Sequence, residues 1–140
     1  MDEYQGRMNR GFRMLKTLGR EGTMMNHQEI YPDLYKLSVG HLFGDIWTRK
    51  HLTVREREII TLTTVIVLAY ASGTQAHCRS ALHIGMTKDE IMELIIQVGA
   101  YAGWPRMAAA VREFAKVLDE ETTKKKGKAR SGTKAKAKAK

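Results

Sequence analysis

The sequence predicts an all-α protein of about six helices, followed by a disordered, Lys-rich C-terminal tail. Apolar residues recur at helical intervals in several segments, and no segment shows the period-two alternation of a half-buried strand. Two Ser/Thr-x-x-Glu capping boxes, at residues 53–56 and 87–90, mark helix starts because they satisfy the free backbone donors of a first turn. We therefore predict one helical domain over residues 1–121 and a tail over residues 122–140.

The N-terminal part of the chain predicts two helices. Apolar residues at helical intervals over the first 17 residues indicate an amphipathic helix that ends near Gly19 or Gly22. Residues 22–28 are expected to form a loop, and Pro32 suits the first turn of the second helix. The residues expected on the apolar side of that second helix are Leu34, Leu37, Leu42 and Phe43.

The central segment begins at the first capping box and is predicted as a buried helix from Val54 to about Ala71. Eight of the 13 residues from Ile59 are β-branched, which is a strand-like composition. The length of the run and its capped, charged lead-in favour a helix instead, and a helix that is apolar all round is a buried one. A linker over residues 72–74 should lead to a short helix that carries His77 and ends at Gly85.

Two more helices complete the predicted domain. The second capping box begins an apolar stripe at helical spacing, and residues 103–105 break the chain before a final amphipathic helix that fades after Leu118. Beyond Thr122 the chain contains Lys, Ala, Gly, Thr, Ser and Arg only, which cannot bury enough apolar surface to offset its ordering entropy.

The basic character of the chain is confined to this tail. The formal net charge is +9, but residues 124–140 hold nine of the cations and no acid, and the rest has 15 Lys+Arg against 15 Asp+Glu. A weak contact with nucleic acid or another polyanion through residues 124–140 is therefore one interpretation, and a tail that only aids solubility is another.

Composition also suggests the compartment. A single cysteine, Cys78, allows no disulfide or Cys-x-x-Cys pair within the chain. The N-terminus lacks the cationic and apolar regions of a signal peptide, and the apolar run from Ile59 is shorter than the ~20 residues that span a bilayer. We expect a cytoplasmic protein without membrane contact.

His77 and Glu58 are the candidate catalytic residues. An imidazole exchanges protons near neutral pH, and the small residues around His77 leave room for a ligand. Glu58 shares a helical stripe with core residues, so its carboxylate should be buried and should need a partner. The alternatives are a structural histidine bonded to backbone, and an acid that only complements the helix dipole.

Further residues are candidates for substrate binding. Arg57 has the planar guanidinium that binds carboxylates bidentately, although a solvated arginine is the alternative. Those that could line a cavity are Asp45, Trp47, His83, Tyr101 and Trp104, with core or interface packing as the alternative for both tryptophans. Cys78 is expected to act as a small apolar side chain, and no Cys/His/Asp cluster has the spacing of a metal site.

Three pieces of the sequence carry a resemblance to a known family. They are FGDIWTR with LTVRERE in residues 43–58, H-x5-H-x-G-x-T-x2-E from His77, and Q-x3-Y-A-G-x-P from Gln97. Together they resemble the carboxymuconolactone decarboxylase family over roughly residues 31–118. The resemblance implies an all-α fold, homotrimers or homohexamers with active sites at or near the subunit interfaces, and a cofactor-free decarboxylation of 4-carboxymuconolactone to the 3-oxoadipate enol-lactone in aromatic catabolism.

The wider superfamily includes alkylhydroperoxidase D-like proteins with the pattern Glu-x11-Cys-x2-Cys-x3-His. Its glutamate and histidine fall on Glu58 and His77, but Tyr70 and Gly73 stand at the two cysteine positions. Dithiol peroxidase chemistry is therefore excluded in its usual form. Departures from the decarboxylase include His83 where Asn is frequent, Glu58 where Ser is frequent, and an N-terminal segment without its Val-Arg-Arg and Val-Leu-Gly elements.

The favoured hypothesis is a cofactor-free lyase acting on a lactone or β-keto-type acid. In it Arg57 holds a substrate carboxylate, His77 protonates the carbanion, and Glu58 tunes His77. The alternatives are an alkylhydroperoxidase-like antioxidant protein that would use Cys78 alone, and a non-catalytic oligomeric scaffold that binds polyanions through its tail.

Overall fold

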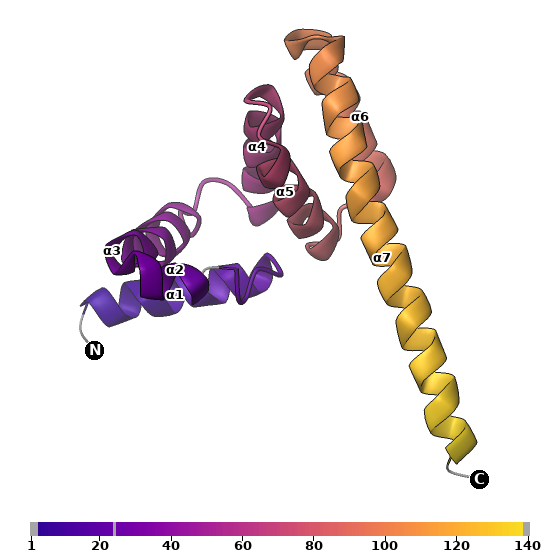
Figure 1. The fold of residues 1–140 in the computed structure, drawn as a ribbon. Coiled ribbons are helices and arrows are strands. Elements are labelled where there is room, and N and C mark those ends of the chain that lie inside the picture. The colour runs from indigo at the N-terminus through magenta and orange to yellow at the C-terminus, as the bar shows by residue number, and fades with distance from the viewer. Residues whose placement is uncertain (1–2, 24, 139–140) are drawn as a thin grey trace.

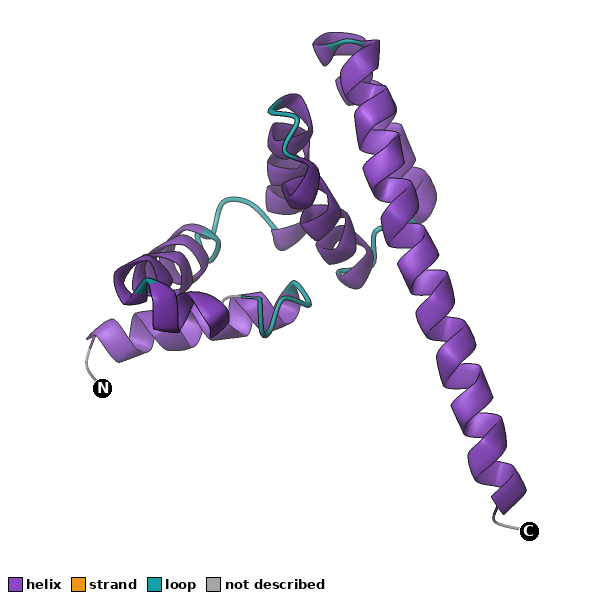
Figure 2. Ribbon diagram, in the orientation of Figure 1, coloured by secondary structure: helices purple, strands orange, loops and turns teal. Residues whose placement is uncertain are grey.

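The computed structural model describes residues 3–23 and 25–138, and every regular element among them is a helix (Figure 2). The predicted all-α class is confirmed. There are more helices than the six expected. They are α1 (Glu3–Thr17), α2 (Met25–Ile30), α3 (Pro32–Lys36), the π-helix η1 (Leu37–Ile46), α4 (Val54–Val67), α5 (Ala71–His83), α6 (Lys88–Ala102) and α7 (Trp104–Lys138).

The N-terminal helices form one layer around a small apolar core. Helix α1 lies along η1 with α2 and α3 beside them (Figure 1). The buried members of this core, called the N-terminal cluster, are Met8, Leu15, Leu18, Tyr35, Val39, Phe43 and Trp47. Gly11 allows the close approach of α1 to η1, because a Cβ there would stand 1.9 Å from the carbonyl oxygen of Val39.

The apolar side of the second helix differs from the one predicted. Leu34, Leu37 and Leu42 are exposed, and of the four expected residues Phe43 is the buried one. The inward side chains of α3 and η1 recur instead at every fourth position, from Tyr35 to Trp47. The π-helix explains the change: its backbone bonds join residues five apart, as in Trp47 N–H to Leu42 O at 3.0 Å, which places successive fourth residues on one face.

Helices α4 to α7 form the second layer, with α4 and α5 antiparallel and α7 alongside α5 and α6 (Figure 1). Its main core, the C-terminal cluster, includes Leu62 and Ile66 of α4, Ala81 of α5, Ile95 of α6 and Phe114 of α7. Both predicted capping boxes are present and start α4 and α6 at Val54 and Lys88.

The turn between α4 and α5 comes earlier than the sequence predicts. Helix α4 ends at Val67, Ala69 takes a left-handed conformation (φ 55°), and α5 begins at Ala71. Tyr70 N–H bonds back to Val65 O at 2.9 Å, which closes the turn. Residues 72–74, expected as a linker, therefore belong to the first turn of α5.

Helix α7 continues past Thr122, where the sequence predicts the end of order, as far as Lys138. Lysine and alanine are good helix formers, which accounts for this continuation. In Figure 1 the end of α7, in yellow, extends away from the other helices. An isolated helix is marginal in water, so disorder of the tail in solution stays a prediction, and residues 139–140 lie outside the described range. Among the described residues, no helix combines the length and apolar character that crossing a bilayer requires.

Candidate functional site

A buried carboxylate–imidazole pair lies between α4 and α5. The Nδ1 of His77 is 2.7 Å from Oε1 of Glu58. Glu58 is fully buried and His77 is 8% exposed. The two residues named from the sequence as a candidate pair therefore meet, although they are 19 positions apart.

Local structure explains why they meet. The Thr53–Glu56 capping box fixes the start of α4, and Glu58 then shares the buried face of that helix with Leu62 and Ile66. His77 lies in the second turn of the antiparallel helix α5, among its buried residues. A carboxylate buried in this way would be costly without a partner, and the imidazole provides one.

Arg20 is the third polar side chain that meets at this site, and the sequence analysis does not single it out. Its Nη1 is 3.4 Å from Nε2 of His77, on the opposite side of the ring from Glu58. A guanidinium can only donate hydrogen bonds, so Nε2 accepts here and the ring proton is assigned to Nδ1, which donates to Glu58. The imidazole of His77 thus lies between a guanidinium and a carboxylate.

Burial and neighbouring groups act on Arg20 in opposite directions. Burial lowers the pKa of Arg20, while Glu58 and then Tyr70 oppose that shift, and the net direction is downward. A guanidinium stays charged in proteins all the same, so the site carries a fixed and partly desolvated positive charge.

A turn at the end of α1 positions Arg20. Gly19 has φ +66°, and Arg20 N–H bonds to Leu15 O at 2.8 Å while Gly19 N–H bonds to Lys16 O at 3.0 Å. These are the two bonds of a Schellman motif, which needs a left-handed residue at the Gly19 position. The fully buried Leu18 anchors the same turn in the N-terminal cluster.

Aromatic rings form the wall on the side of η1. The ring of Trp47 lies nearly parallel to that of His77, with 6.5 Å between centroids and 16° between planes. The Arg20 guanidinium carbon is 5.6 Å from the centroid of Phe43, a cation–π distance. Both aromatics face inward because of the four-residue spacing of η1, so the π-helix builds this wall.

Two polar atoms of the site are buried without a hydrogen-bond partner among the described residues. They are Oε2 of Glu58 and Nε of Arg20. Such atoms are uncommon because each loses its hydration without compensation. The surroundings of His77 therefore have unused hydrogen-bonding capacity at these two atoms.

Arg57, predicted to bind a substrate carboxylate, points elsewhere. Its Nη2 donates to Arg49 O at 2.8 Å. It lines a hollow of about 300 Å³ together with Trp47, Leu52 and Ile60, and neither His77 nor Arg20 is among the lining residues. Trp47 is thus the predicted binding residue that lies against both this hollow and His77.

The other predicted binding residues lie apart from one another. Asp45 forms ion pairs with Arg7 (3.0 Å) and Arg10 (2.9 Å), which join α1 to η1. Desolvation raises the pKa of Asp45, but the hydrogen bond from Arg10 and the charge of Arg7 outweigh it and leave that pKa lowered. His83 packs on the α1 turn, since a Cβ at Gly19 would come within 2.6 Å of its ring.

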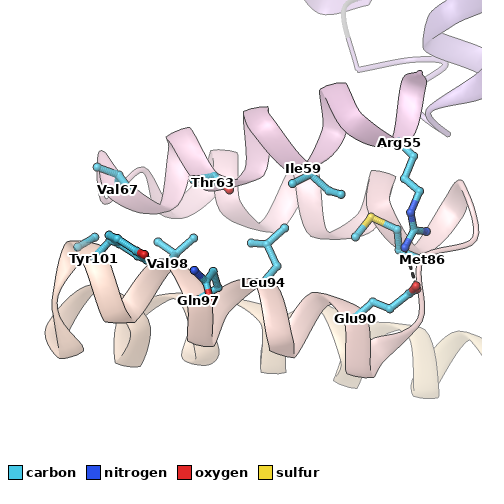
Figure 3. Close-up of a pocket in the computed structure, with 11 residues that line it drawn as sticks. Arg55, Ile59, Thr63, Val67, Met86, Glu90, Leu94, Gln97, Val98 and Tyr101 are labelled. Carbon is cyan, nitrogen blue, oxygen red and sulfur yellow. Dashed lines mark hydrogen bonds and ion pairs between the residues drawn. The ribbon is translucent and has the colours of Figure 1, made fainter. Parts of the chain in front are cut away.

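Tyr101 is 87% exposed and lines a larger, mostly apolar groove of about 550 Å³ between α4 and α6. Figure 3 shows this groove with Tyr101 at one end and the Arg55–Glu90 ion pair (2.5 Å) at the other. The residues that line it include none of the Glu58, His77 and Arg20 group. Trp104 is likewise exposed rather than part of the core.

Tyr70 and Gly73, which stand where the alkylhydroperoxidase D-like pattern has its two cysteines, pack against each other. Gly73 lies under the ring of Tyr70, where a Cβ would come within 2.2 Å of Cδ1 of that ring. Cys78, one residue after His77, is fully buried. Burial, and then the charge of Glu58, raise the pKa of the Cys78 thiol to about 12.

Comparison of the sequence with known proteins shows the family to which the chain belongs. The sequence profile of the carboxymuconolactone decarboxylase family matches residues 32–116. The chain belongs to the carboxymuconolactone decarboxylase family. It is 31% identical over 78 residues to 4-carboxymuconolactone decarboxylase of Acinetobacter baylyi, in an alignment that covers 56% of this chain and 58% of that protein.

The chain is also similar to the nitrosuccinic acid decarboxylase of Metarhizium robertsii. It is 27% identical over 82 residues, which cover 59% of this chain and 57% of the relative. The chain spans less than two thirds of the length of either relative. The family match starts at residue 32, so Glu58, His77 and Trp47 lie inside it and Arg20 lies outside it.

Proposed function

We propose that this chain is a decarboxylase whose acid–base residue is His77, held and charge-balanced by Glu58. The contact of 2.7 Å between Nδ1 of His77 and Oε1 of Glu58 is the observation that carries the proposal. A buried carboxylate on one ring nitrogen orients the imidazole and favours its protonated form, and the other nitrogen then exchanges protons with a ligand.

The proposed reaction breaks the bond between a carboxylate carbon and the adjacent carbon. Carbon dioxide leaves, and the bonding electron pair moves into a neighbouring electron-withdrawing group, such as a conjugated lactone. Nε2 of His77 then delivers a proton, taken from solvent beforehand, to the carbon. The reaction consumes one proton for each carbon dioxide released.

The names of the two relatives support this class of substrate. One acts on 4-carboxymuconolactone and the other on nitrosuccinic acid. A lactone and a nitro group can each accept the electron pair that decarboxylation releases. We propose a carboxylic acid with such a group near the departing carboxylate, with lactones of aromatic catabolism as the first candidates.

The test is turnover of 4-carboxymuconolactone and of nitrosuccinate, followed by carbon dioxide release and lactone absorbance. We expect activity with at least one of the two, and loss of that activity in His77→Gln with the helical circular dichroism spectrum retained. Undiminished turnover in a folded His77→Gln variant would remove His77 from the mechanism. No turnover of either acid by the unaltered protein would count against the decarboxylase assignment itself.

Assembly into homotrimers or homohexamers is part of the proposal. The exposed apolar side chains along α4, including Ile60 and Val67, support it, as does the apolar groove between α4 and α6. Sedimentation equilibrium tests it directly, and a monomer at micromolar concentration would contradict it.

A further inference from the structure

We propose that Arg20, and not Arg57, binds the substrate carboxylate, and that this binding frees Nε2 of His77 to take up the proton that it delivers. The inference rests on the proposed decarboxylase function and deepens it. It adds a residue from outside the segment that matches the family, and it assigns Arg20 two successive partners, the imidazole of His77 as observed and then the carboxylate of the substrate.

The first argument is the present partner of Arg20. The contact from Nη1 to Nε2 of His77, at 3.4 Å, is longer than the 2.7–3.2 Å typical of N–H donors. While it persists, Nε2 is an acceptor and has no proton to give. A neutral imidazole is a weaker partner for a guanidinium than a carboxylate, because the carboxylate adds attraction between opposite charges and can accept two parallel hydrogen bonds.

The second argument is unused donor capacity. Nε of Arg20 is buried and has no partner among the described residues. A carboxylate that approached the edge formed by Nε and one terminal nitrogen would receive two parallel hydrogen bonds, the geometry that arginine and carboxylates share. Such a ligand would satisfy the unpartnered Nε and would lie next to the ring of His77.

The third argument concerns charge. In the observed contact the positive guanidinium faces Nε2 and opposes a second positive charge on the ring. A bound carboxylate neutralises that guanidinium and draws its Nη1 away from Nε2. Glu58 is then the nearest uncompensated charge, and it favours the imidazolium form. Protonation of His77 is thereby coupled to occupancy of the site.

The balance of the reaction is unchanged by this coupling. The proton passes from solvent to Nε2 when the carboxylate binds. After the carbon–carbon bond breaks and carbon dioxide leaves, the same proton forms the new carbon–hydrogen bond, and Nε2 returns to its acceptor state. Arg20 keeps its charge throughout and binds the carboxylate that stays on the product.

Arg57 fits this role less well. Its Nε is also buried without a partner among the described residues, so unused donor capacity does not separate the two arginines. Its Nη2, however, donates to Arg49 O at 2.8 Å, and it lines a hollow whose lining residues do not include His77. Arg20, in contrast, contacts the proton-transferring nitrogen itself. Arg57 is therefore a matched control. It is an arginine that lines a hollow with Trp47, and its replacement should not change the binding of the substrate carboxylate.

The test is nitrogen NMR of the full chain, labelled with 15N-histidine, at one fixed pH near neutrality, with succinate as the probe. We expect the unliganded protein to show His77 with Nδ1 protonated and Nε2 unprotonated. Succinate should move the Nε2 signal to the range of a protonated nitrogen. In Arg20→Gln the dependence on succinate should vanish, with the apparent Kd raised at least about tenfold, the loss expected for a charge-assisted pair.

The controls keep the result interpretable. Arg57→Gln removes the hydrogen bond to Arg49 O but no contact with His77 or Arg20, so its Kd for succinate should stay within about twofold of the unaltered protein. Arg20→Lys keeps the positive charge but lacks the paired donors of the guanidinium, so it should recover part of the shift of the Nε2 signal on addition of succinate. If succinate shifts Nε2 equally with and without Arg20, or if Arg57→Gln abolishes the response, the proposal is wrong.

Turnover separates this inference from the proposed function. With whichever acid is decarboxylated, Arg20→Gln should raise KM about tenfold or more and also lower kcat, because it removes both binding and the coupling to protonation. Absence of turnover in the unaltered protein would refute the decarboxylase proposal, whereas the NMR response of Nε2 to succinate would still decide the role of Arg20.

Discussion

Glu58 and His77 show how a single buried pair can cost stability and still be retained. Both residues gave up most of their hydration, and one carboxylate oxygen has no partner among the described residues. Replacement of a buried ion pair by apolar residues is often neutral or stabilising, whereas removal of one member leaves an uncompensated charge. The proposed function therefore accounts for this pair better than its contribution to stability does.

The corresponding prediction compares single and double replacements. His77→Leu should lower the free energy of unfolding by about 3 kcal/mol, because the Glu58 carboxylate loses its partner. Glu58→Met combined with His77→Leu should return it to within about 1 kcal/mol of the unaltered protein, without activity. Urea unfolding measures both values. A double variant as unstable as the single one would mean that the pair is structural.

Cys78 supports a second prediction at this scale. Because the pKa of its thiol is raised to about 12, the reactive thiolate is scarce at pH 8. Native protein should resist iodoacetamide at that pH and react fully once unfolded in urea, as mass spectrometry would record. Peroxide consumption should be the same in Cys78→Ala, and a drop in that variant would revive the single-thiol antioxidant hypothesis.

Some residues of the candidate site can be placed from the sequence next to them, and others only from contacts with distant parts of the chain. Glu58 could be predicted from its own helix, because a capping box fixed the start and the apolar stripe fixed the face. Arg20 could not, since nothing in residues 15–23 indicates contact with a histidine 57 positions later. A charged residue in a turn is usually solvated, and only tertiary packing distinguishes this one.

Among the helices, too, features set by local sequence signals could be predicted, and features set by packing could not. Thr53 and Thr87 begin α4 and α6 as predicted, since a capping box is a local bond pattern. The π-helix η1 was missed, because its register is stabilised by packing against α1 rather than by a short-range signal. The face it buries, with Phe43 and Trp47, was therefore mispredicted in part.

The turn after α4 gives a prediction at the element scale. Ala69 holds φ 55°, a conformation that costs an L-residue about 1 kcal/mol or more, whereas glycine adopts it freely. Ala69→Gly should therefore raise the free energy of unfolding by up to about 1 kcal/mol, with the entropy of glycine in the unfolded chain offsetting part of the gain. A loss of stability would contradict the assigned backbone conformation.

Gly85 is the matched control for that turn. It ends α5 with φ +92°, and a Cβ added there would meet nothing within 4 Å, so a substitution tests the backbone alone. Gly85→Ala should lower the free energy of unfolding by about 1 kcal/mol. Denaturant titration of the two variants in parallel should show shifts of opposite sign.

At the scale of the whole molecule, the candidate site lies where the two layers meet. Ile84 packs against both clusters, and His83 packs on the turn that carries Arg20. Glu58 and His77 come from one layer, and Arg20 and Trp47 from the other. The first layer extends before residue 32, so the match to the family does not include Arg20.

The basic tail should contribute little to the stability of the folded body. The buried core residues of the two clusters end at Val117, so the core is complete before the basic stretch begins. A chain that ends at Lys124 loses eight cations and no acid. Its free energy of unfolding should change by less than about 0.5 kcal/mol, as for surface changes in general.

Binding to nucleic acid should respond to the same truncation if the tail contacts polyanions. The full chain should then bind duplex DNA at low salt with an affinity that falls steeply as salt is added, because phosphate contacts release counterions. The chain that ends at Lys124 should lose this binding while its turnover stays the same. Equal DNA affinity for the two chains would show that the tail is not a polyanion-binding segment, and a large loss of stability would show that it packs on the body.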